Sequence, residues 1–308
     1  MNVSINGSNV SKYIESISWS GDENQLARKV TISYLYAPQD PNVHNISVRK
    51  GDRLILEDGI ILFDGILLTE ERTENDIKMQ SMAYDYAWYL RGKAFGVYKG
   101  SPAAVTAAVC AEAGVACGTL YDPGGEVEVI STGEKSIAQV IQTAYEGKDA
   151  HLYMQGQTVC VEKYGEQLAG TVTGDDAVMD AQYKSSIENL VNQVVILGAS
   201  DQPIGEVSNG LTGYGIIREA YKQTGDEKDV AGEARKLLKG IEDSGKVVVR
   251  GNPAYQTGRA IVVEKVNSKI RGRFTIISDE HAWTGSDYQT TLGLRLSLIH
   301  ISEPTRQA

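Results

Sequence analysis

The side chains best suited to chemistry in this 308-residue chain lie in two acidic stretches. In the first, Asp175, Asp176 and Asp180 offer the oxygen ligands that a hard cation prefers. Their spacing is not that of a calcium loop, which favours a solvated loop with a helix cap. In the second, the run from Ser278 to His281 (SDEH) sets carboxylates beside a histidine, as general acid/base catalysis requires. No nucleophile motif accompanies this run, so the alternative is a hydrogen-bonding cluster at a strand end.

A cluster of three glycines, Gly210, Gly213 and Gly215, is the part of the chain that most resembles a phosphate-binding loop. Neither the Lys-Ser/Thr pair of such a loop nor a strand-to-helix context follows these glycines. The cluster therefore indicates a polar loop without a nucleotide, which we predict from Ser200 to Tyr214.

The three cysteines, Cys110, Cys117 and Cys160, lie in or beside apolar runs. An odd number without a fourth close ligand favours buried free thiols over a disulfide framework or a zinc site. Cys110 would act as a nucleophile only if a histidine approached it. With four histidines and no serine-hydrolase or HExxH motif, we predict no catalytic residue, no cofactor and no metal. A carboxylate pair assembled by folding stays open.

The composition is that of a globular protein with an acidic surface. Hydrophobic residues make up 42% of the chain, charged residues make up 23%, and the net charge is -10. Such a charge argues against a nucleic-acid reader, because phosphate binding needs a basic surface. It does not exclude a surface past which DNA slides without adhering, and simple solubility accounts for the charge equally well. The chain shows no long apolar run and no signal-peptide pattern, so we expect no membrane insertion and folding in a cytoplasm.

The elements that would position these residues begin with a β-rich segment. From Gly51 to Gly92, short apolar runs alternate with Asp/Gly and Asn/Asp turns, one of them predicted at Asp64-Gly65, and show no helical period. Three further strands are predicted before this segment, at about residues 3–5, 14–19 and 30–36. We predict that residues 1–95 form an antiparallel β-barrel domain.

The pattern changes at about residue 96. Ser101-Pro102 predicts a helix start, with serine as the cap and proline at the first helical position. A second helix is predicted from Ser136 to Gly147, followed by a β-hairpin over residues 151–163. Residues 96–170 are therefore predicted to form a small α+β module.

Strands resume in residues 171–295. One helix interrupts them near residues 226–240, where Asp226 is a candidate cap. The strands after Lys246 repeat the pattern of Gly51–Gly92 without repeating its residues. We therefore predict a β-rich α+β fold in which two antiparallel β-barrel domains flank the small module.

Residues 296–308 are excluded from this prediction. Most of the segment reads LSLIHISEPTR, which resembles the translation of a sequencing adapter, and a native final strand is the alternative. If the segment replaces a native C-terminus, the closing strand of the second barrel would be clipped or distorted.

Several short motifs together resemble the XkdQ/YqbQ group of phage tail proteins, known from PBSX-like defective prophages of Gram-positive bacteria. Each motif is short, and the resemblance rests on the whole set, which covers nearly all of the chain before residue 296. The motifs are WSGD at 19–22, QLARKV at 25–30, GD at 51–52, FDG at 63–65, YDYAWYL at 84–90, GRFTIIS at 272–278, HAW at 281–283 and TL at 291–292.

The resemblance implies a baseplate hub of a contractile tail that has two tail-tube-like barrels per chain and assembles as a homotrimer. Three copies of two barrels would present six similar barrels to a six-fold tube and keep three-fold symmetry for the spike. The implied partners are the tail tube protein, the spike protein and baseplate wedge proteins, with DNA only passing through a lumen. The implied location is the virion tail baseplate, after assembly in the bacterial host cytoplasm.

Two other functions stay open: a tail-associated cell-wall hydrolase, and the hub of a tailocin or related contractile injection apparatus. Some members of the group carry hydrolase labels, although this chain shows no matching catalytic residues. The aromatic cluster of Tyr84, Tyr86, Trp88 and Tyr89 is a candidate partner surface, because interfaces favour tyrosine and tryptophan. Packing in the barrel core is the alternative for at least half of this cluster.

Overall fold

The computed structural model describes residues 1–72, 77–173, 178–225, 229–264 and 270–295. These residues form two compact units, the first made of residues 1–181 and 246–295 and the second of residues 182–245. The predicted domain boundaries near residues 95 and 170 stay predictions. No helix within the described ranges is long and apolar enough to cross a membrane.

The first unit is built around a 13-stranded sheet whose strands come from both ends of the chain. The main path of the sheet runs β14-β18-β21-β20-β3-β4-β7-β6-β5-β1-β2, and β13 joins through β19, which pairs with β20. Two of these strands, β14 and β18, continue into the second unit. The bounds are β1 Asn2–Ile5, β2 Ser8–Asn9, β3 Ile14–Asp22, β4 Lys29–Leu35, β5 Arg53–Glu57, β6 Ile61–Arg72, β7 Lys78–Asp85, β13 Leu168–Thr173, β14 Val178–Ser186, β18 Glu242–Arg250, β19 Ala260–Glu264, β20 Arg271–Thr284 and β21 Asp287–Arg295.

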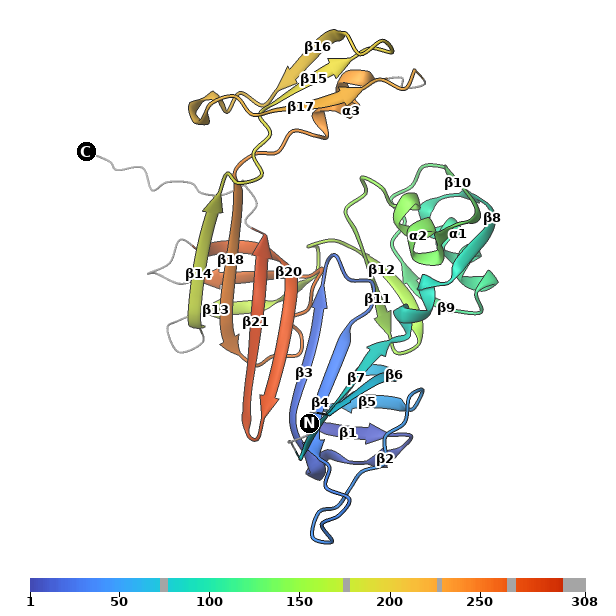
Figure 1. Cartoon of the computed structure of the whole chain (residues 1–308), viewed down its shortest axis with the longest axis vertical. Coiled ribbons are helices and arrows are strands. Elements are labelled where there is room, and N and C mark those ends of the chain that lie inside the picture. The colour runs from blue at the N-terminus through green and yellow to red at the C-terminus, as the bar shows by residue number, and fades with distance from the viewer. Residues whose placement is uncertain (73–76, 174–177, 226–228, 265–269, 296–308) are drawn as a thin grey trace, which may run out of the picture. The chain divides into compact units, whose positions relative to one another are not determined.

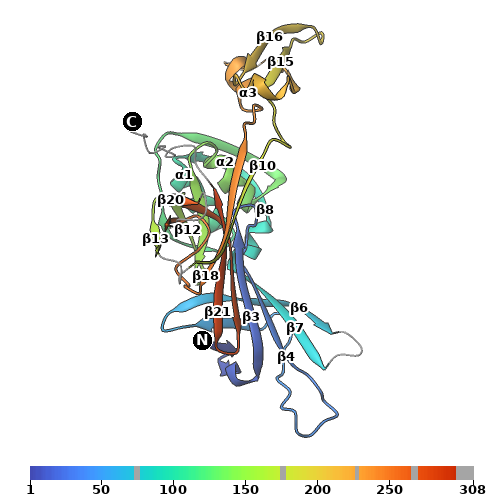
Figure 2. The ribbon, with the colours of Figure 1, turned by 90° about the vertical axis from the view of Figure 1, so that its left-hand side faces the viewer.

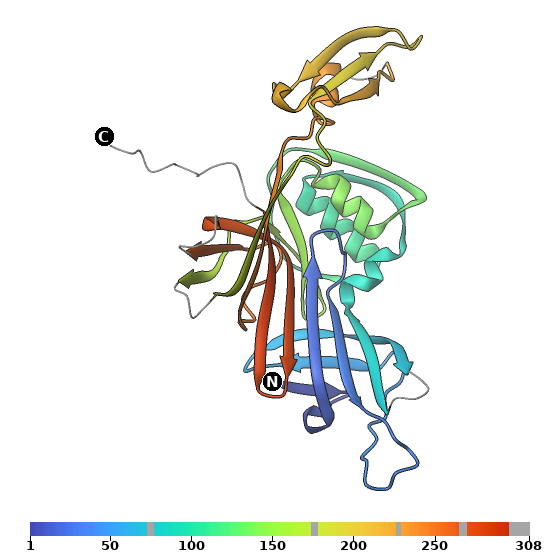
Figure 3. The same cartoon turned by 60° about the vertical axis from the view of Figure 1, so that its left-hand side comes forward.

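The two ends of the chain meet where β3 pairs with β20. The pairing is antiparallel and runs from Ser16 opposite Thr284 to Asp22 opposite Ser278. Figure 1 shows β3 and β4 beside β20 and β21. The sheet curls on both sides of this junction: β5 and β6 cross the direction of β3 and β4 (Figures 2 and 3), and β13 crosses that of β18 (Figure 1). Both predicted barrel segments thus contribute to one curled sheet, and two closed barrels are not seen in the described residues.

Alternating side chains explain why these segments form strands. In β4, Val30, Ile32 and Tyr34 are buried while the residues between them are not, which is the period of two that a half-buried strand requires. The core that they enter also contains Trp283 from β20. The hydrophobic core of the N-terminal half is therefore completed by a residue from the C-terminal end of the chain.

One predicted turn is wrong. Asp64-Gly65 was expected to separate two short strands, but both residues lie inside the single strand β6. Asp64 is tolerated there because Arg53 on the paired strand β5 donates two hydrogen bonds to its carboxylate, at 2.8 and 2.6 Å. Gly65 is required because a Cβ at this position would collide with the carbonyl oxygen of Tyr84 and the ring of Phe63.

The predicted elements of the α+β module are confirmed. Ser101 caps the first helix, and Ser136 begins the second with a capping box, although that helix ends before Gly147. The predicted hairpin is β11 and β12, and the two helices lie side by side against β8 and β10 (Figure 3). The bounds are β8 Lys93–Gly100, α1 Pro102–Glu112, β9 Ala116–Leu120, β10 Val127–Ser136, α2 Ile137–Ala144, β11 Ala150–Gln155 and β12 Thr158–Lys163.

The second unit is a three-stranded sheet with one short helix. The strands β15 (Gln193–Leu197), β16 (Pro203–Ser208) and β17 (Arg218–Lys222) pair in the order β16-β15-β17. The polar stretch predicted as a loop therefore contains a strand, which the hydrophobic pattern missed because β16 is an exposed edge. The predicted helix is the shorter α3 (Val230–Arg235), capped by Asp229, whereas Asp226 lies outside the described residues.

Candidate functional site

A buried ion pair joins the two halves of the sheet next to the pairing of β3 with β20. Arg28, which precedes β4, donates from Nη1 to Oδ1 of Asp279 at 2.9 Å and from Nη2 to Oδ2. Thr257 donates to the same carboxylate from its N–H at 2.6 Å and from its hydroxyl at 2.7 Å. Asp279 is only 2% exposed, and burial alone would raise the pKa of its carboxyl. The charge of Arg28 and the hydrogen bond from His281 outweigh burial and lower this pKa, so Asp279 is ionised at neutral pH.

His281 lies fully buried beside this pair. Its Nε2 is 3.1 Å from the carbonyl oxygen of Tyr255 and 3.3 Å from Oδ2 of Asp279, and its Nδ1 is 2.9 Å from the hydroxyl of Tyr288. Burial lowers the pKa of His281, and the neighbouring Asp279 offsets only part of that shift. The ring is therefore neutral at neutral pH. Because both partners of Nε2 are acceptors, the proton resides on Nε2, and Nδ1 accepts from Tyr288.

This geometry bears on the acid/base hypothesis for the run from Ser278 to His281. Asp279 and His281 lie on the buried face in the interior of β20, and both carboxylate oxygens and both ring nitrogens are engaged. Glu280 points to the opposite face, where it is exposed and accepts a hydrogen bond from Ser18 at 3.1 Å. The alternative, a hydrogen-bonding cluster, is confirmed, within a strand instead of at its end. The cluster can hold two parts of the chain together, but its groups are not placed to exchange protons with a substrate.

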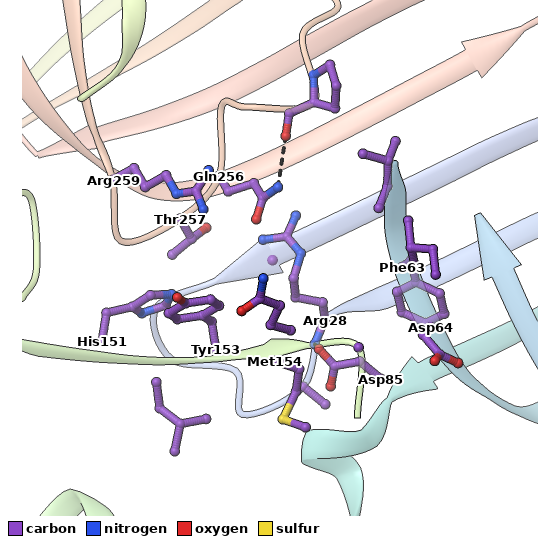
Figure 4. A pocket seen from close by; sticks show the side chains of 18 of the residues that line it. Arg28, Phe63, Asp64, Asp85, His151, Tyr153, Met154, Gln256, Thr257 and Arg259 are labelled. Carbon is purple, nitrogen blue, oxygen red and sulfur yellow. Dashed lines mark hydrogen bonds between the residues drawn. The ribbon is translucent and has the colours of Figure 1, made fainter. Parts of the chain in front are cut away.

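A polar cavity of about 360 Å³ opens beside the junction, entirely within the first unit. Figure 4 shows the ends of Arg28 and Gln256 approaching each other from different segments, and His151 and Tyr153, from β11, lying beside each other. Burial, followed by the charge of Arg28, lowers the pKa of His151 to about 4, and burial raises the pKa of Tyr153 to about 12. Both side chains are therefore neutral at pH 7. The cavity holds charged groups at its wall without presenting an activated nucleophile.

The acidic and basic groups of the cavity wall are incompletely paired. Nε of Arg259 lies 4.0 Å from Oε1 of Glu162, and Oε2 of Glu162 has no hydrogen-bond partner among the described residues. Burial raises the pKa of Glu162, and the charge of Arg259 opposes that shift. The wall between the α+β module and the sheet is thus polar, unlike the apolar cores on either side of it.

Asp85 is a buried carboxylate at this cavity with two backbone donors. Its Oδ2 accepts the N–H of Arg28 at 3.2 Å, and its Oδ1 accepts the N–H of Ala87 at 3.0 Å. The second bond caps the 3-10 helix η2 (Tyr86–Arg91). Burial raises the pKa of Asp85 to about 7, although the hydrogen bond and charge of Arg28 limit the rise.

Replacing Asp85 with asparagine is expected to remove a pH-dependent loss of stability. The carboxyl ionises near pH 4 in the unfolded chain and near pH 7 in the folded chain, so the folded state binds more protons in this window. The free energy of unfolding of the wild type therefore falls as pH rises through it. Urea unfolding should show the Asp85→Asn variant gaining about 2–3 kcal/mol relative to the wild type between pH 5 and pH 8. The exposed control Asp180→Asn should show no such change, and a pH-independent difference at Asp85 would contradict the argument.

The four residues of the predicted aromatic cluster differ in how far they are exposed. Tyr84 and Trp88 are partly buried and pack against the core of the α+β module, not that of the sheet. Tyr89 is 46% exposed, and its ring stacks with that of the half-buried Tyr86 at a centroid distance of 5.9 Å. The role of this cluster as a partner surface stays a prediction, for which Tyr86 and Tyr89 are the available residues.

The other described candidate residues do not line the cavity. Cys110 and Cys160 are buried, Cys117 is partly buried, and all three are free thiols, as predicted. Asp180 is exposed, and Asp175 and Asp176 lie outside the described residues. Within the described ranges, no group of three or more histidine, cysteine, aspartate or glutamate side chains could hold a metal ion.

The glycine-rich loop of the second unit is organised around a buried amide. Nδ2 of Asn192 donates to the carbonyl oxygens of Leu211 and Gly215, at 2.8 and 2.6 Å, and its Oδ1 accepts the N–H of Ile217 at 2.8 Å. Gly215 adopts a φ of 83°, which explains a glycine at that position. The glycine cluster therefore lies in a turn whose backbone is hydrogen-bonded to the side chain of Asn192.

Arg28, Thr257 and Tyr255 are the members of the junction that motif reasoning missed. Arg28 and Asp279 are separated by 251 positions, so no spacing rule links them. The only sequence signal was that Arg28 falls in the QLARKV motif, which carried a resemblance but no role.

Comparisons with known proteins agree with this architecture. A model of the YqbQ-like family matches residues 17–295, and a search of curated proteins finds no match. The 43 kDa tail protein of prophage MuSo2 from Shewanella oneidensis is 10% identical with a TM-score of 0.75, covering 96% of this chain and 97% of that one. A tail protein from Neisseria meningitidis MC58 is 15% identical with a TM-score of 0.72, covering 96% of each chain.

A third similar structure is the E. coli c3393 protein, described as a component of the type VI secretion system with structural similarity to the T4 tail proteins gp27 and gp5. It is 10% identical with a TM-score of 0.59, covering 97% of this chain and 78% of that one. At these identities the likeness concerns the fold, whereas the family match spans most of the chain. The resemblance expected from the motifs is therefore confirmed, and the chain belongs to the YqbQ-like family.

Proposed function

We propose that this chain is a structural hub component of the baseplate of a contractile phage or prophage tail. In this role it joins the tail tube to the central spike by assembling into a ring. The observation that carries the proposal is the curled sheet, which takes strands from both ends of the chain and resembles two tail proteins over 96% of this chain.

The two halves of the sheet would act as two tube-type barrels in the assembly. The main path of the sheet ends at β2 and β14, and strands at sheet edges carry backbone N–H and C=O groups that a neighbouring chain can pair. A homotrimer would then place six similar half-barrels in a ring beneath a six-fold tube. The tube protein, the spike protein and the wedge proteins are the proposed partners, and the net charge of -10 would let DNA pass without adhering.

Assembly is the direct test of this role. Light scattering should give three times the chain mass of 33.4 kDa, and negative-stain images should show rings. A strictly monomeric protein that also fails to bind the tail tube protein would contradict the hub role. Because residues 296–308 resemble an adapter, the experiment should include a variant that ends at Arg295.

Tyr86 and Tyr89 of the aromatic cluster offer a mutational test of partner binding. Replacing Tyr86 and Tyr89 with alanine should weaken binding of the assembled hub to a partner about tenfold or more, as loss of interface tyrosines commonly does. Tyr214→Ala, at a tyrosine of the second unit that is 51% exposed, is the matched control and should change affinity little. Titration of each purified partner on an immobilised hub measures both effects, and equal affinities for all three proteins would exclude the aromatic surface.

The hydrolase alternative makes a different prediction. A cell-wall hydrolase should clear peptidoglycan in a zymogram and lose that activity in Glu280→Gln and His281→Ala variants. The hub should show no clearing, because His281 is buried and its ring nitrogens are engaged. A hub of an injection apparatus is the second alternative, favoured by the similarity to the c3393 protein. Neighbouring reading frames distinguish that apparatus from a phage tail.

A further inference from the structure

Two of the three cysteines lie together inside the α+β module. Cys110 is fully buried near the end of α1, and Cys117 is partly buried on β9. The chain reverses direction between them, where the N–H of Val115 donates to the carbonyl oxygen of Cys110 at 2.8 Å. Both side chains contact the same hydrophobic core, in which α1 packs against β9. The thiols are therefore neighbours across the packing of α1 on β9.

The third cysteine is on the other side of the module's sheet. Cys117 is paired in register with Val159 on the parallel strand β12, and Val159 belongs to the core that contains Cys110. Alternation along β12 turns Cys160 to the opposite face. There its Sγ lies 2.7 Å from the position that a Cβ on Gly118 would occupy. Cys160 thus lies on the opposite face of the sheet from the pair, near enough to Cys117 to add to burial in raising the pKa of that thiol.

We propose that Cys110 and Cys117 are a latent disulfide pair, which closes when the folded protein meets a disulfide oxidant, and that Cys160 takes no part. The thiolate of Cys117, the more accessible of the two, attacks glutathione disulfide, forming a mixed disulfide and releasing one glutathione thiolate. The thiolate of Cys110 then attacks Sγ of Cys117, so that the intramolecular bond forms and a second glutathione leaves. Two thiols are oxidised, one glutathione disulfide is reduced to two glutathiones, and the protons pass to solvent and to the released thiolates.

Burial of the two thiols makes this reaction slow at neutral pH. Burial raises the pKa of Cys110 to about 12, and it also raises that of Cys117. Few thiolates are present at neutral pH, so the pair remains reduced in a reducing cytoplasm and closes slowly in an oxidising medium. The closed bond would tie the end of α1 to β9 and restrict the unfolded chain. Its use after a virion has left its host rests on the proposed function, whereas the bond itself does not.

The digestion pattern of the chain allows a clear test. Trypsin leaves Cys110 and Cys117 in one peptide, residues 100–135, and Cys160 in another, residues 149–163, and Glu112 separates the first two cysteines. The folded full chain is incubated with glutathione disulfide, alkylated, digested with trypsin and then with a glutamyl endopeptidase, and weighed by mass spectrometry.

The pair predicts that peptide 100–135 loses two hydrogen atoms and takes no alkyl group, and that fragments 100–112 and 113–126 stay joined after cleavage at glutamate until they are reduced. Cys160→Ser should behave as the wild type, and Cys110→Ser should stop at the mixed disulfide on Cys117. The thermal midpoint of the oxidised wild type should exceed that of the reduced form.

Linkage of peptides 100–135 and 149–163, a stable mixed disulfide in the wild type, or absence of reaction under conditions that oxidise the denatured chain would each overturn the proposal. Ring assembly of the reduced protein is measured separately, so a failed hub role and a failed disulfide give different results.

Discussion

Replacing Asp279 with alanine is expected to lower the free energy of unfolding by about 3–5 kcal/mol, the usual cost of removing one partner from a buried ion pair. The guanidinium of Arg28, whose side chain is only 15% exposed, would lose both of its hydrogen bonds to a carboxylate. Thr257 would lose the acceptor of both its N–H and its hydroxyl. Urea unfolding followed by tryptophan fluorescence measures the change.

The adjacent residue supplies a matched control for this prediction. Glu280 is on the same strand, carries a carboxylate and is exposed, so Glu280→Ala should change the free energy of unfolding by less than about 0.5 kcal/mol. Arg28→Met should resemble Asp279→Ala, and the two substitutions together should cost clearly less than the sum of their separate effects, because they remove the same interaction. Equal losses for Asp279→Ala and Glu280→Ala, or strict additivity with Arg28→Met, would refute a coupled pair.

Replacing Trp19 with alanine is also expected to lower the free energy of unfolding by about 3–5 kcal/mol, measured by the same unfolding experiment. The side chain is 1% exposed and lies in the centre of the junction. Its ring stacks on His281 at a centroid distance of 4.6 Å, and the guanidinium carbon of Arg28 lies 4.4 Å from its centroid. Alanine would leave a cavity between the two halves of the sheet and remove a cation–π contact from Arg28.

Trp19→Phe is the control that separates the loss of aromatic packing from the effect of any substitution at this position. Phenylalanine keeps an aromatic face for His281 and Arg28, and it removes an indole N–H that has no hydrogen-bond partner among the described residues. The expected cost is therefore about 1–2 kcal/mol, well below that of alanine. If the two variants are equally unstable, the stacked arrangement does not contribute as the structure indicates.

These substitutions test the junction that shapes the proposed hub. The contacts of Arg28, Trp19 and Asp279 fix how β3 lies against β20, and this pairing makes one curled sheet from two separate segments. A destabilised junction should therefore also weaken ring assembly, because the open edges would no longer be held in one geometry. The Glu280→Ala protein should assemble as the wild type does.

Part of this architecture could be predicted because its causes are local. The starts of both module helices followed from Ser101-Pro102 and from Ser136, and the structure confirms both caps. Most strands of the sheet followed from alternating apolar residues, as in β4. The misread turn at Asp64-Gly65 shows the limit, because the reasons for an aspartate and a glycine within a strand are Arg53 and Tyr84 on its neighbours.

What the sequence determined by itself was the set of local elements and, through short motifs, the family. Caps, turns and alternation act over a few residues, so they can be recognised without knowledge of the fold. Only the tertiary structure decided that β3 pairs with β20, that Asp279 and His281 are buried, and that Cys110 and Cys117 share a core that does not include Cys160. These outcomes depend on which distant segments pack together, and local preference does not specify a partner 251 positions away.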